Sequence, residues 1–344
     1  MATLKDVAKR AQVSIATVSH VINGTRHVSP DLSERVKAAM ETLAYHPNAV
    51  ARSLRMQCTH TIGLVVSDIT NPFFSMLARG AEDACIEQDH SLIICNSDED
   101  PSKEQLYCEL LYQKRVDGLL IAPMGMSEES VRFLAQRQVP FTFVDRIIGG
   151  IQADSVVSDN AQGAYEATRH LVDFGHTRIG FTAGQEHVWT SQERFNGYKR
   201  ALDEAGIPFD ADLIVRGNLK FSGGFEACKR LLGLENPPSA IFIAHNFMVY
   251  GALKCLREEH LSCPKDLALV GFDVDWAGIL DPPLTVVVQQ PYEMGYKAVE
   301  LLFQRIGKRG HQASNLQANP QMVRLKTELR HPGSTTAKPV RKQR

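Results

Sequence analysis

Residues 3–23, TLKDVAKRAQVSIATVSHVIN, decide the fold at the amino-terminal end of this 344-residue chain. Thr3 and Asp6 have the spacing of a capping box, in which two side chains bond the first backbone amides of a helix. The apolar residues around them share one face of that helix: Leu4, Val7, Ala8 and Ala11. The stretch therefore predicts a short amphipathic helix that must bury this face against other elements.

A second short helix follows a turn at residues 12–13. Ser14 is its candidate N-cap, and its apolar face consists of Val18, Val21 and Ile22. Two helices this short bury little surface, so a third amphipathic segment, residues 30–43, is needed to close a core. The residues that it supplies are Val36, Ala39, Met40 and Leu43. We predict an all-α helix-turn-helix head over residues 1–45.

The start of the second helix carries the candidate DNA contacts, because a helix-turn-helix places this helix in the major groove. The residues that we expect to face DNA are Ser14, Ile15, Ala16, Thr17, Ser19, His20 and Asn23. Hydroxyl groups suit phosphate oxygens, Ile15 and Ala16 suit thymine methyl groups, and His20 suits the edge of a base. By itself, the pattern fits a three-helix bundle without a nucleic-acid role equally well.

The charge distribution favours the DNA-binding interpretation. The chain has 38 Lys and Arg and 39 Asp and Glu, but residues 1–55 hold eight basic and only four acidic side chains. The remainder, with 30 basic and 35 acidic residues, is mildly acidic. A basic head on an acidic body is expected of a protein that meets DNA at one end only.

Two motifs at this spacing, residues 3–23 and YHPNAVARSLR at residues 45–55, closely resemble the amino terminus of the lactose/purine repressor (LacI/GalR) family. Further similarity runs along almost the whole chain, in TIGLVV, NPFF, RVDGLLI, VDR, GHTRIGF, RFNGY and LVGFD. The resemblance implies a sequence-specific transcriptional regulator, most often a repressor. It also implies a homodimer that binds a pseudo-palindromic DNA operator under the control of a small sugar-type effector.

The resemblance further implies a hinge helix and linker over residues 46–59. Leu54 matches the leucine that family members insert into the minor groove, and Arg55 lies beside it. An apolar wedge between base steps kinks the duplex, while a neighbouring arginine neutralises phosphate. Without the resemblance, a linker helix with its leucine packed inward is the simpler interpretation.

From about residue 60, short β-branched runs alternate with amphipathic segments, a pattern that predicts parallel sheets covered by helices on both faces. The strands that we predict are 61–67, 91–96, 118–122, 141–144, 156–158, 178–182, 240–244 and 267–272. The resemblance implies that this α/β body consists of two doubly wound parallel-sheet subdomains of periplasmic-binding-protein type.

We assign residues 60–330 to this effector-binding and dimerisation domain. The first subdomain is expected at about 60–159 and 290–318, and the second at about 160–288 and 319–330. Residues 331–344 are rich in Pro, Ser, Thr and basic residues, so we expect a disordered tail.

Open parallel sheets bind ligands beyond the carboxyl ends of their strands, and clefts between domains are favoured sites. The candidate effector contacts therefore follow predicted strands: Phe73, Arg146, Trp189, Arg194, Asn246, Asp273 and Trp276. Carboxylate, amide and guanidinium groups bond hydroxyls. Each residue alone fits a structural role as well. The resemblance implies effector contacts at Phe73, Arg146, Arg194 and Asp273.

The pair His245–Asn246 departs from the family pattern, in which many sugar-binding members carry Asn-Asp. An amide in place of a carboxylate, in a cleft with Arg146 and Arg194, repels anions less. We therefore favour a sugar acid or sugar phosphate over a neutral sugar as the effector.

Motifs of enzymes and metal sites are not apparent in the sequence. It has no phosphate-binding glycine loop, no HExxH and no GxSxG, and its histidines show no metal-ligand spacing. The seven cysteines form no CxxC pair, which favours free thiols in a reducing compartment. We expect no cofactor, no metal and no catalytic centre.

We also expect a cytoplasmic protein without a membrane partner, because no signal peptide and no membrane-length apolar run is present. Two alternatives remain open besides an enzyme, which is the weakest. The head argues against a stand-alone sugar-binding protein, and an effector-independent architectural DNA-binding protein needs no cleft.

Overall fold

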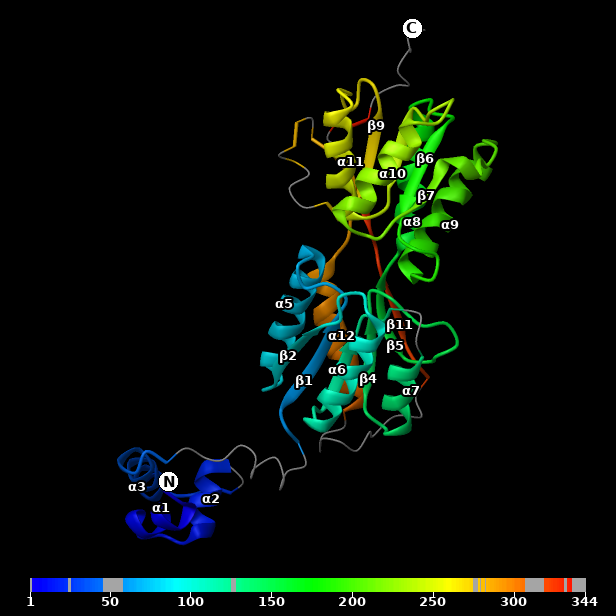
Figure 1. The fold of residues 1–344 in the computed structure, drawn as a ribbon. Coiled ribbons are helices and arrows are strands. Elements are labelled where there is room, and N and C mark those ends of the chain that lie inside the picture. The colour runs from blue at the N-terminus through cyan, green and yellow to red at the C-terminus, as the bar shows by residue number, and fades with distance from the viewer. Residues whose placement is uncertain are drawn as a thin grey trace. The chain divides into compact units, whose positions relative to one another are not determined.

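The computed structural model describes residues 2–23, 26–45, 58–124, 128–274, 278, 280–281, 283–306, 319–330 and 333–335. The chain divides into two compact units, residues 1–59 and 60–344, which we describe separately (Figure 1). None of the helices in these ranges combines the length and the apolar character that crossing a membrane requires.

The first unit is the predicted helix-turn-helix head, with helices α1 (Leu4–Ala11), α2 (Ile15–Asn23) and α3 (Pro30–Thr42). The capping box is present, since the Thr3 amide donates to the Asp6 carboxylate at 2.8 Å and the Asp6 amide donates to Thr3 Oγ1 at 3.3 Å. The fully buried core confirms the predicted apolar faces: Val7, Ala8, Ala11, Val18, Val36 and Ala39. The Arg35 guanidinium donates to the Ala11 carbonyl at 2.7 Å, which satisfies the end of α1 and ties α3 to the turn.

The second unit begins with an entirely parallel sheet in the order β11-β5-β4-β3-β1-β2. Its strands are β1 (Thr61–Val66), β2 (Ser91–Asn96), β3 (Gly118–Ile121), β4 (Phe141–Val144), β5 (Asp154–Ser158) and β11 (Met322–Leu325). Alternate strand residues face opposite layers. Ile62 and Leu64 pack against α5 (Pro72–Glu87) and α12 (Pro291–Arg305), whereas Val65 packs against α6 (Pro101–Gln113) and α7 (Glu129–Gln136).

The second sheet repeats this design in the order β12-β10-β9-β8-β6-β7. Its strands are β6 (Ile179–Ala183), β7 (Ile214–Arg216), β8 (Ala240–Ile243), β9 (Ala268–Phe272), β10 (Thr285–Val288) and β12 (Glu328–Arg330). Helices α8 (Asn160–Asp173) and α9 (Trp189–Glu204) cover one face, and α10 (Phe221–Leu232) and α11 (Asn246–Glu258) cover the other. A 3-10 turn at Ala211–Leu213 precedes β7. All eight predicted strands are present, whereas β7, β10, β11 and β12 were not predicted.

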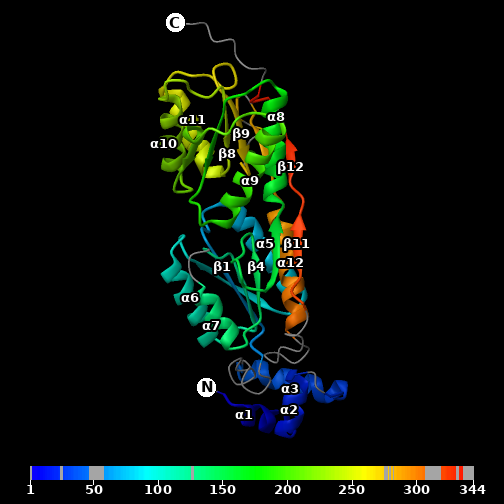
Figure 2. The ribbon, with the colours of Figure 1, turned by 90° about the vertical axis from the view of Figure 1, so that its right-hand side faces the viewer.

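The chain passes between the two sheets at β5–α8, at β10–α12 and at β11–β12. Figure 2 shows β11 and β12 following one another along the edges of the two sheets. The assignment of residues 319–330 to the second subdomain is therefore wrong for β11, which pairs in parallel with β5 of the first. Only β12 joins the second sheet, antiparallel to β10.

The prediction of a disordered tail is wrong at residues 333–335. Ser334 is fully buried, accepts a hydrogen bond from the Thr285 amide at 2.6 Å, and donates to the Leu269 carbonyl at 2.7 Å. The next residue, Thr335, bonds His170 Nε2 at 2.7 Å. Small hydroxyl side chains predict disorder by composition, but here they satisfy backbone groups at the second sheet. The rest of the tail lies outside the described residues.

Candidate functional site

The candidate DNA-binding surface of the head is the start of α2. The Thr17 amide donates to Ser14 Oγ at 3.0 Å, so Ser14 caps the helix as predicted. Ile15 is 45% exposed, and Ala16 is exposed beside it. Thr17, Ser19 and His20 are half-buried. An exposed isoleucine next to the cap of a second helix is available for contacts with thymine methyl groups. The base contacts themselves stay predictions.

Three of the predicted DNA contacts are not described, or are described only in part. Leu54 and Arg55, with most of the expected hinge, lie outside the described residues. The backbone of Asn23 ends α2, but its side chain is not described.

Between the two sheets of the body lies a cavity at the carboxyl ends of the strands. Its lining consists of Asn71, Phe73, Phe74, Asp145, Arg146, Thr190, Arg194, His245, Asn246, Phe272, Asp273 and Gln289. The structure thus brings five of the seven predicted effector contacts to one place. The lining residues are spread along the sequence between Asn71 and Gln289, so the sequence alone does not show that they meet.

The two aspartates of the cavity occupy equivalent positions in the two sheets. Asp145 follows β4 with a backbone φ of +64°, and Asp273 follows β9 with a φ of +56°. Each backbone amide bonds the neighbouring strand, Asp145 to the Val156 carbonyl at 3.0 Å and Asp273 to the Val287 carbonyl at 2.7 Å. A left-handed backbone is unfavourable for most residues, and such positions cluster at functional sites.

Arg146 is neutralised by the protein itself. Its guanidinium donates twice to Glu99, at 3.0 and 2.8 Å, and its Nε lies 3.4 Å from Asp145 Oδ2. Burial opposes the charge, yet the nearby Glu99 and Asp145 carboxylates raise the pKa of Arg146 above its ordinary value. Arg146 therefore serves first as the partner of two carboxylates.

Arg194 is also buried, but it has a different environment. Its Nε donates to Asn160 Oδ1 at 2.8 Å, its Nη1 donates to the Ala244 carbonyl at 2.7 Å, and its plane lies 3.7 Å from the Phe272 ring. No carboxylate of the described residues lies within 4.0 Å of it. Burial lowers the pKa of Arg194 to about 10, so the group remains charged at neutral pH. The Asp145 and Asp273 carboxylates favour the charged form through space, and the guanidinium belongs to the lining of the cavity.

Three further buried atoms of the cavity lack hydrogen-bond partners among the residues described: Arg146 Nε, His245 Nδ1 and Gln289 Oε1. Burial, together with Arg194 and Arg146, lowers the pKa of His245 to about 3, so this imidazole is neutral. Buried polar atoms without partners are costly and uncommon in native proteins. A ligand with both donors and acceptors would satisfy them.

Asn246 was expected to contact the effector, but here it bonds Asn71 across the cleft and closes the cavity. Its Nδ2 donates to Asn71 Oδ1 at 2.8 Å, and Asn71 Nδ2 donates back to Asn246 Oδ1 at 3.3 Å. Asn71 also caps α5 by accepting from the Phe73 amide at 3.1 Å. The pair joins the two subdomains over a cavity of about 30 Å³, which holds about one water molecule. A sugar enters only if the subdomains separate.

The two predicted tryptophan contacts are not part of this lining. Trp189 begins α9 and is half-buried, and the Arg324 guanidinium lies 5.9 Å from its ring. Arg324 of β11 also pairs with Glu193 at 3.3 Å, so these residues join the two subdomains beside the cavity. Trp276 lies outside the described residues. The cavity residues missing from the prediction include Thr190 and Gln289, and Gln289 directly follows β10, a strand that was not predicted.

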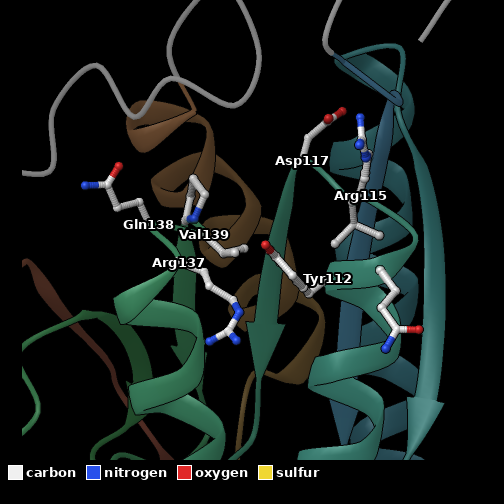
Figure 3. A pocket seen from close by; sticks show the side chains of 9 residues that line it. Tyr112, Arg115, Asp117, Arg137, Gln138 and Val139 are labelled. Atoms are coloured by element: carbon white, nitrogen blue, oxygen red, sulfur yellow. The ribbon is translucent and has the colours of Figure 1, made fainter. Parts of the chain in front are cut away.

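A larger hollow of about 430 Å³ lies at the opposite end of the first sheet, where β3 and β4 begin. Figure 3 shows Tyr112 and Arg137 pointing toward each other across it. The Arg137 guanidinium lies 5.4 Å from the Tyr112 ring and 3.9 Å from the Phe133 ring. These residues are mostly exposed and follow the ends of α6 and α7, where cations balance the helix dipole. The hollow contains none of the predicted effector contacts.

Comparison with known families decides the identity of the chain. Residues 3–48 match the model described as bacterial regulatory proteins, lacI family, and residues 59–328 match periplasmic binding proteins and sugar binding domain of LacI family. The chain belongs to the LacI family. Family membership makes it a DNA-binding transcriptional regulator with an effector-binding body.

Individual relatives of this LacI-family protein agree with that assignment. It is 36% identical over 329 residues to the HTH-type transcriptional repressor PurR of Aliivibrio salmonicida, covering 95% of this chain and 99% of that protein. The lac repressor dimer bound to operator and the anti-inducer ONPF superposes with a TM-score of 0.85 at 25% identity, covering 98% and 99% of the two chains. The transcriptional regulator CelR in complex with cellobiose gives 0.73 at 30% identity, covering 97% and 100%.

Proposed function

We propose that this protein is an operator-binding repressor whose DNA affinity is set by a small anionic sugar derivative, a sugar acid or sugar phosphate, bound between the two subdomains. The observation that carries the effector class is Arg194, a buried cation without a carboxylate partner among the described residues. Isolating a buried charge is costly, and an anionic ligand relieves that cost. Phosphates and carboxylates also suit the planar donors of a guanidinium.

The buried cavity atoms without hydrogen-bond partners indicate which other groups the ligand carries. Gln289 Oε1 requires a donor such as a hydroxyl, and the neutral His245 offers Nδ1 without a partner among the described residues. Asp273 has one carboxylate oxygen bonded to the Gln289 amide at 3.2 Å and faces the same space. Phe73 and Phe74 supply apolar surface. A polyhydroxylated chain with one acidic group meets these requirements together.

The protein is proposed to act as a homodimer on a pseudo-palindromic operator, because a two-fold protein matches a two-fold site. The first subdomain has an apolar surface along the edge strand β2 and the helices on either side. Its exposed residues are Met76, Ile86, Ile93, Ile94, Leu106 and Leu110. Apolar residues gathered on an edge strand and its flanking helices are typical of a protein interface.

Effector binding controls DNA affinity, in this proposal, through the separation of the subdomains. The closed cavity admits no sugar, so the ligand changes the balance between closed and open forms. A ligand shifts operator affinity only by its differential affinity for the two forms, commonly ~1–3 kcal/mol. The protein works by binding rather than catalysis, without a cofactor, in the cytoplasm with the chromosome.

The test is operator selection followed by effector titration with the full chain. Selection from random duplexes is expected to give a pseudo-palindromic site, and its fluorescence anisotropy then reports affinity in the presence of gluconate, glucose 6-phosphate or glucose. We expect an anionic probe to change the operator affinity by ~5–150-fold. Leu54→Ala is expected to weaken operator binding without altering effector binding.

Two results would reject the proposal. Selection without any enriched sequence would favour an architectural DNA-binding protein. Equal responses to neutral and anionic sugars that persist in Arg194→Gln would reject the anionic effector while leaving operator binding intact.

A further inference from the structure

A cluster of metal-ligating side chains lies at the opposite edge of the first sheet from the effector cavity. His60, His90 and Asp117 are each the residue immediately before a strand, β1, β2 and β3 respectively. The strand register pairs Thr61 with Ser91 and Ile62 with Gly118, so the three preceding residues meet at the amino edge of the sheet. These three residues are far apart in the sequence, so they form no recognisable metal-binding motif.

The tautomer of each imidazole is set by its backbone contact. His60 Nδ1 lies 3.1 Å from the Asp89 carbonyl, and His90 Nδ1 lies 2.5 Å from the Gln88 carbonyl. A carbonyl only accepts, so each Nδ1 carries hydrogen, and in the neutral ring each Nε2 presents a lone pair. This is the outer-shell arrangement that orients metal-binding histidines, with one nitrogen bonded to a carbonyl and the other facing the ion.

No hydrogen-bond donor of the described residues reaches the lone pair of His60 Nε2 or His90 Nε2. Both are buried without a hydrogen-bond partner in the described structure, and the side chain of His90 is only 8% exposed. The two imidazole rings lie with their centroids 5.0 Å apart, and ligand nitrogens of the pair approach within 4.8 Å. Asp117 Oδ2 lies 3.3 Å from His90 Nε2. Cys58, His60 and His90 each place one ligand atom within 4.8 Å of the other two, and the Asp117 carboxylate lies beside His90.

We propose that His60, His90 and the Cys58 thiolate bind a divalent transition-metal ion of the zinc type, with the Asp117 carboxylate beside His90. Cys58 lies two residues before His60 in the chain and supplies a soft ligand beside the two imidazoles. Two imidazoles and one thiolate are ligands that suit tetrahedral zinc, in which water can take the fourth position. This inference revises the sequence-based expectation of no metal, and it does not depend on the proposed effector.

The surroundings of the cluster hold the ligands in place. His90 packs edge-on against Phe303 of α12 with ring centroids 4.7 Å apart, and the His60 carbonyl accepts from the Ser91 amide at 2.9 Å. His60 has a left-handed backbone with a φ of +51°. A bound ion would fix the start of β1 to the turn before β2. This is the point at which the chain enters the body, so metal occupancy would stiffen that entry.

A competing explanation is a proton in place of the metal. A protonated His90 pairs with Asp117 but leaves His60 Nε2 without a partner, whereas a metal ion satisfies both nitrogens. The two explanations differ in what a cobalt titration shows.

The experiment titrates Co²⁺ into the chelator-treated full-length protein and follows the visible absorption of tetrahedral cobalt, with Zn²⁺ competition to obtain the affinity. We expect one ion per chain and a thiolate-to-cobalt band. His60→Gln and His90→Gln are each expected to lower the affinity by more than about tenfold, since loss of an outer-shell partner alone costs ~10–100-fold. Cys58→Ser is expected to abolish the thiolate band.

The matched controls are His187→Gln and Cys263→Ser, which remove a half-buried imidazole and a half-buried thiol away from the cluster. Both should bind Co²⁺ as the wild type does. Circular dichroism checks that each variant folds. If a histidine variant does not fold, Cys58→Ser still tests whether the cluster binds the metal. No tetrahedral spectrum in the wild type, or an unchanged spectrum in the folded variants, would overturn the proposal.

Discussion

The two subdomains of the body share one strand order but treat their cleft arginines in opposite ways. In the first, Arg146 is paired with Glu99 and lies beside Asp145. In the second, Arg194 donates to an amide oxygen and to a backbone carbonyl and lies on the face of Phe272, with no ion pair among the described residues. The cleft arginine of the first subdomain thus forms an ion pair, whereas the cleft arginine of the second forms none among the described residues.

This difference separates a structural role from a ligand-binding role. A buried ion pair holds its own geometry, and loss of one partner leaves an uncompensated charge. A buried arginine without a carboxylate partner costs stability, and a bound anion recovers it. We infer that Arg146 mainly organises the first half of the cleft, whereas Arg194 selects the ligand.

The largest expected effect is on stability, from removal of Arg146. Arg146→Met leaves Glu99 and the buried Asp145 unpaired, and we expect it to lower the free energy of unfolding by ~3–5 kcal/mol. Arg194→Met leaves two neutral acceptors unpaired and is expected to cost ~1–3 kcal/mol. Urea unfolding of the full chain measures both. A larger loss in Arg194→Met would reverse the comparison.

A second test compares helix packing in the two subdomains. A Cβ at Gly295 of α12 would lie 2.0 Å from the Leu77 carbonyl oxygen, and one at Gly224 of α10 would lie 1.9 Å from that of Met248. Either glycine-to-alanine change is expected to cost ~1–3 kcal/mol, because overpacking forces backbones apart. Gly149→Ala, which would meet nothing within 4 Å, is the control. Equal stability of all three variants would show that the helices separate at no cost.

The neutral state of His245 gives a pH test of the cleft. The pKa of His245 is about 3 in the folded protein and 6.5 for an ordinary histidine, so the unfolded chain takes up a proton first as pH falls. Stability is therefore lost between about pH 6.5 and 3, at ~1.4 kcal/mol per pH unit. Unfolding of His245→Gln across this range should fall less steeply than that of the wild type. Parallel slopes would contradict the burial of a neutral imidazole.

The smallest expected effect concerns the amide pair that joins the two halves. Asn246→Asp removes the Nδ2 donor to Asn71 and places two acceptors opposite each other, which we expect to weaken closure by ~1 kcal/mol. The added charge should also weaken binding of an anionic probe more than that of glucose. Isothermal calorimetry with gluconate and glucose measures the difference. Equal losses for both probes would count against the anionic effector.

Local features were predictable from the sequence where neighbours along the chain make the contact. The Thr3–Asp6 capping box and the N-cap at Ser14 require only a spacing of three residues. Arg194 and Asp273 were expected at one cleft because residues after parallel strands gather at one edge and because the family resemblance implies them there, and both lie in the cavity lining. Side chains that meet across the fold gave no such signal. The Asn71–Asn246 pair joins residues 175 positions apart.

The prediction also did not foresee the late strands. β11 and β12 lie in one short stretch yet join different sheets, because the chain crosses between subdomains at residues 326–327. Register, rather than local composition, likewise brings His60, His90 and Asp117 together. Ser334 belongs to a polar segment that composition marks as disordered, yet it satisfies backbone groups of the second sheet.

Arg194 is proposed to bind an anionic effector in the cleft. A thermal-shift titration of the full-length wild type and Arg194→Gln, with gluconate, glucose 6-phosphate and glucose, tests it most directly. We expect an anionic probe to raise the melting temperature of the wild type and to leave that of the folded Arg194→Gln unchanged, with little effect of glucose. A shift caused only by glucose, or an anionic shift that persists in Arg194→Gln, would contradict it.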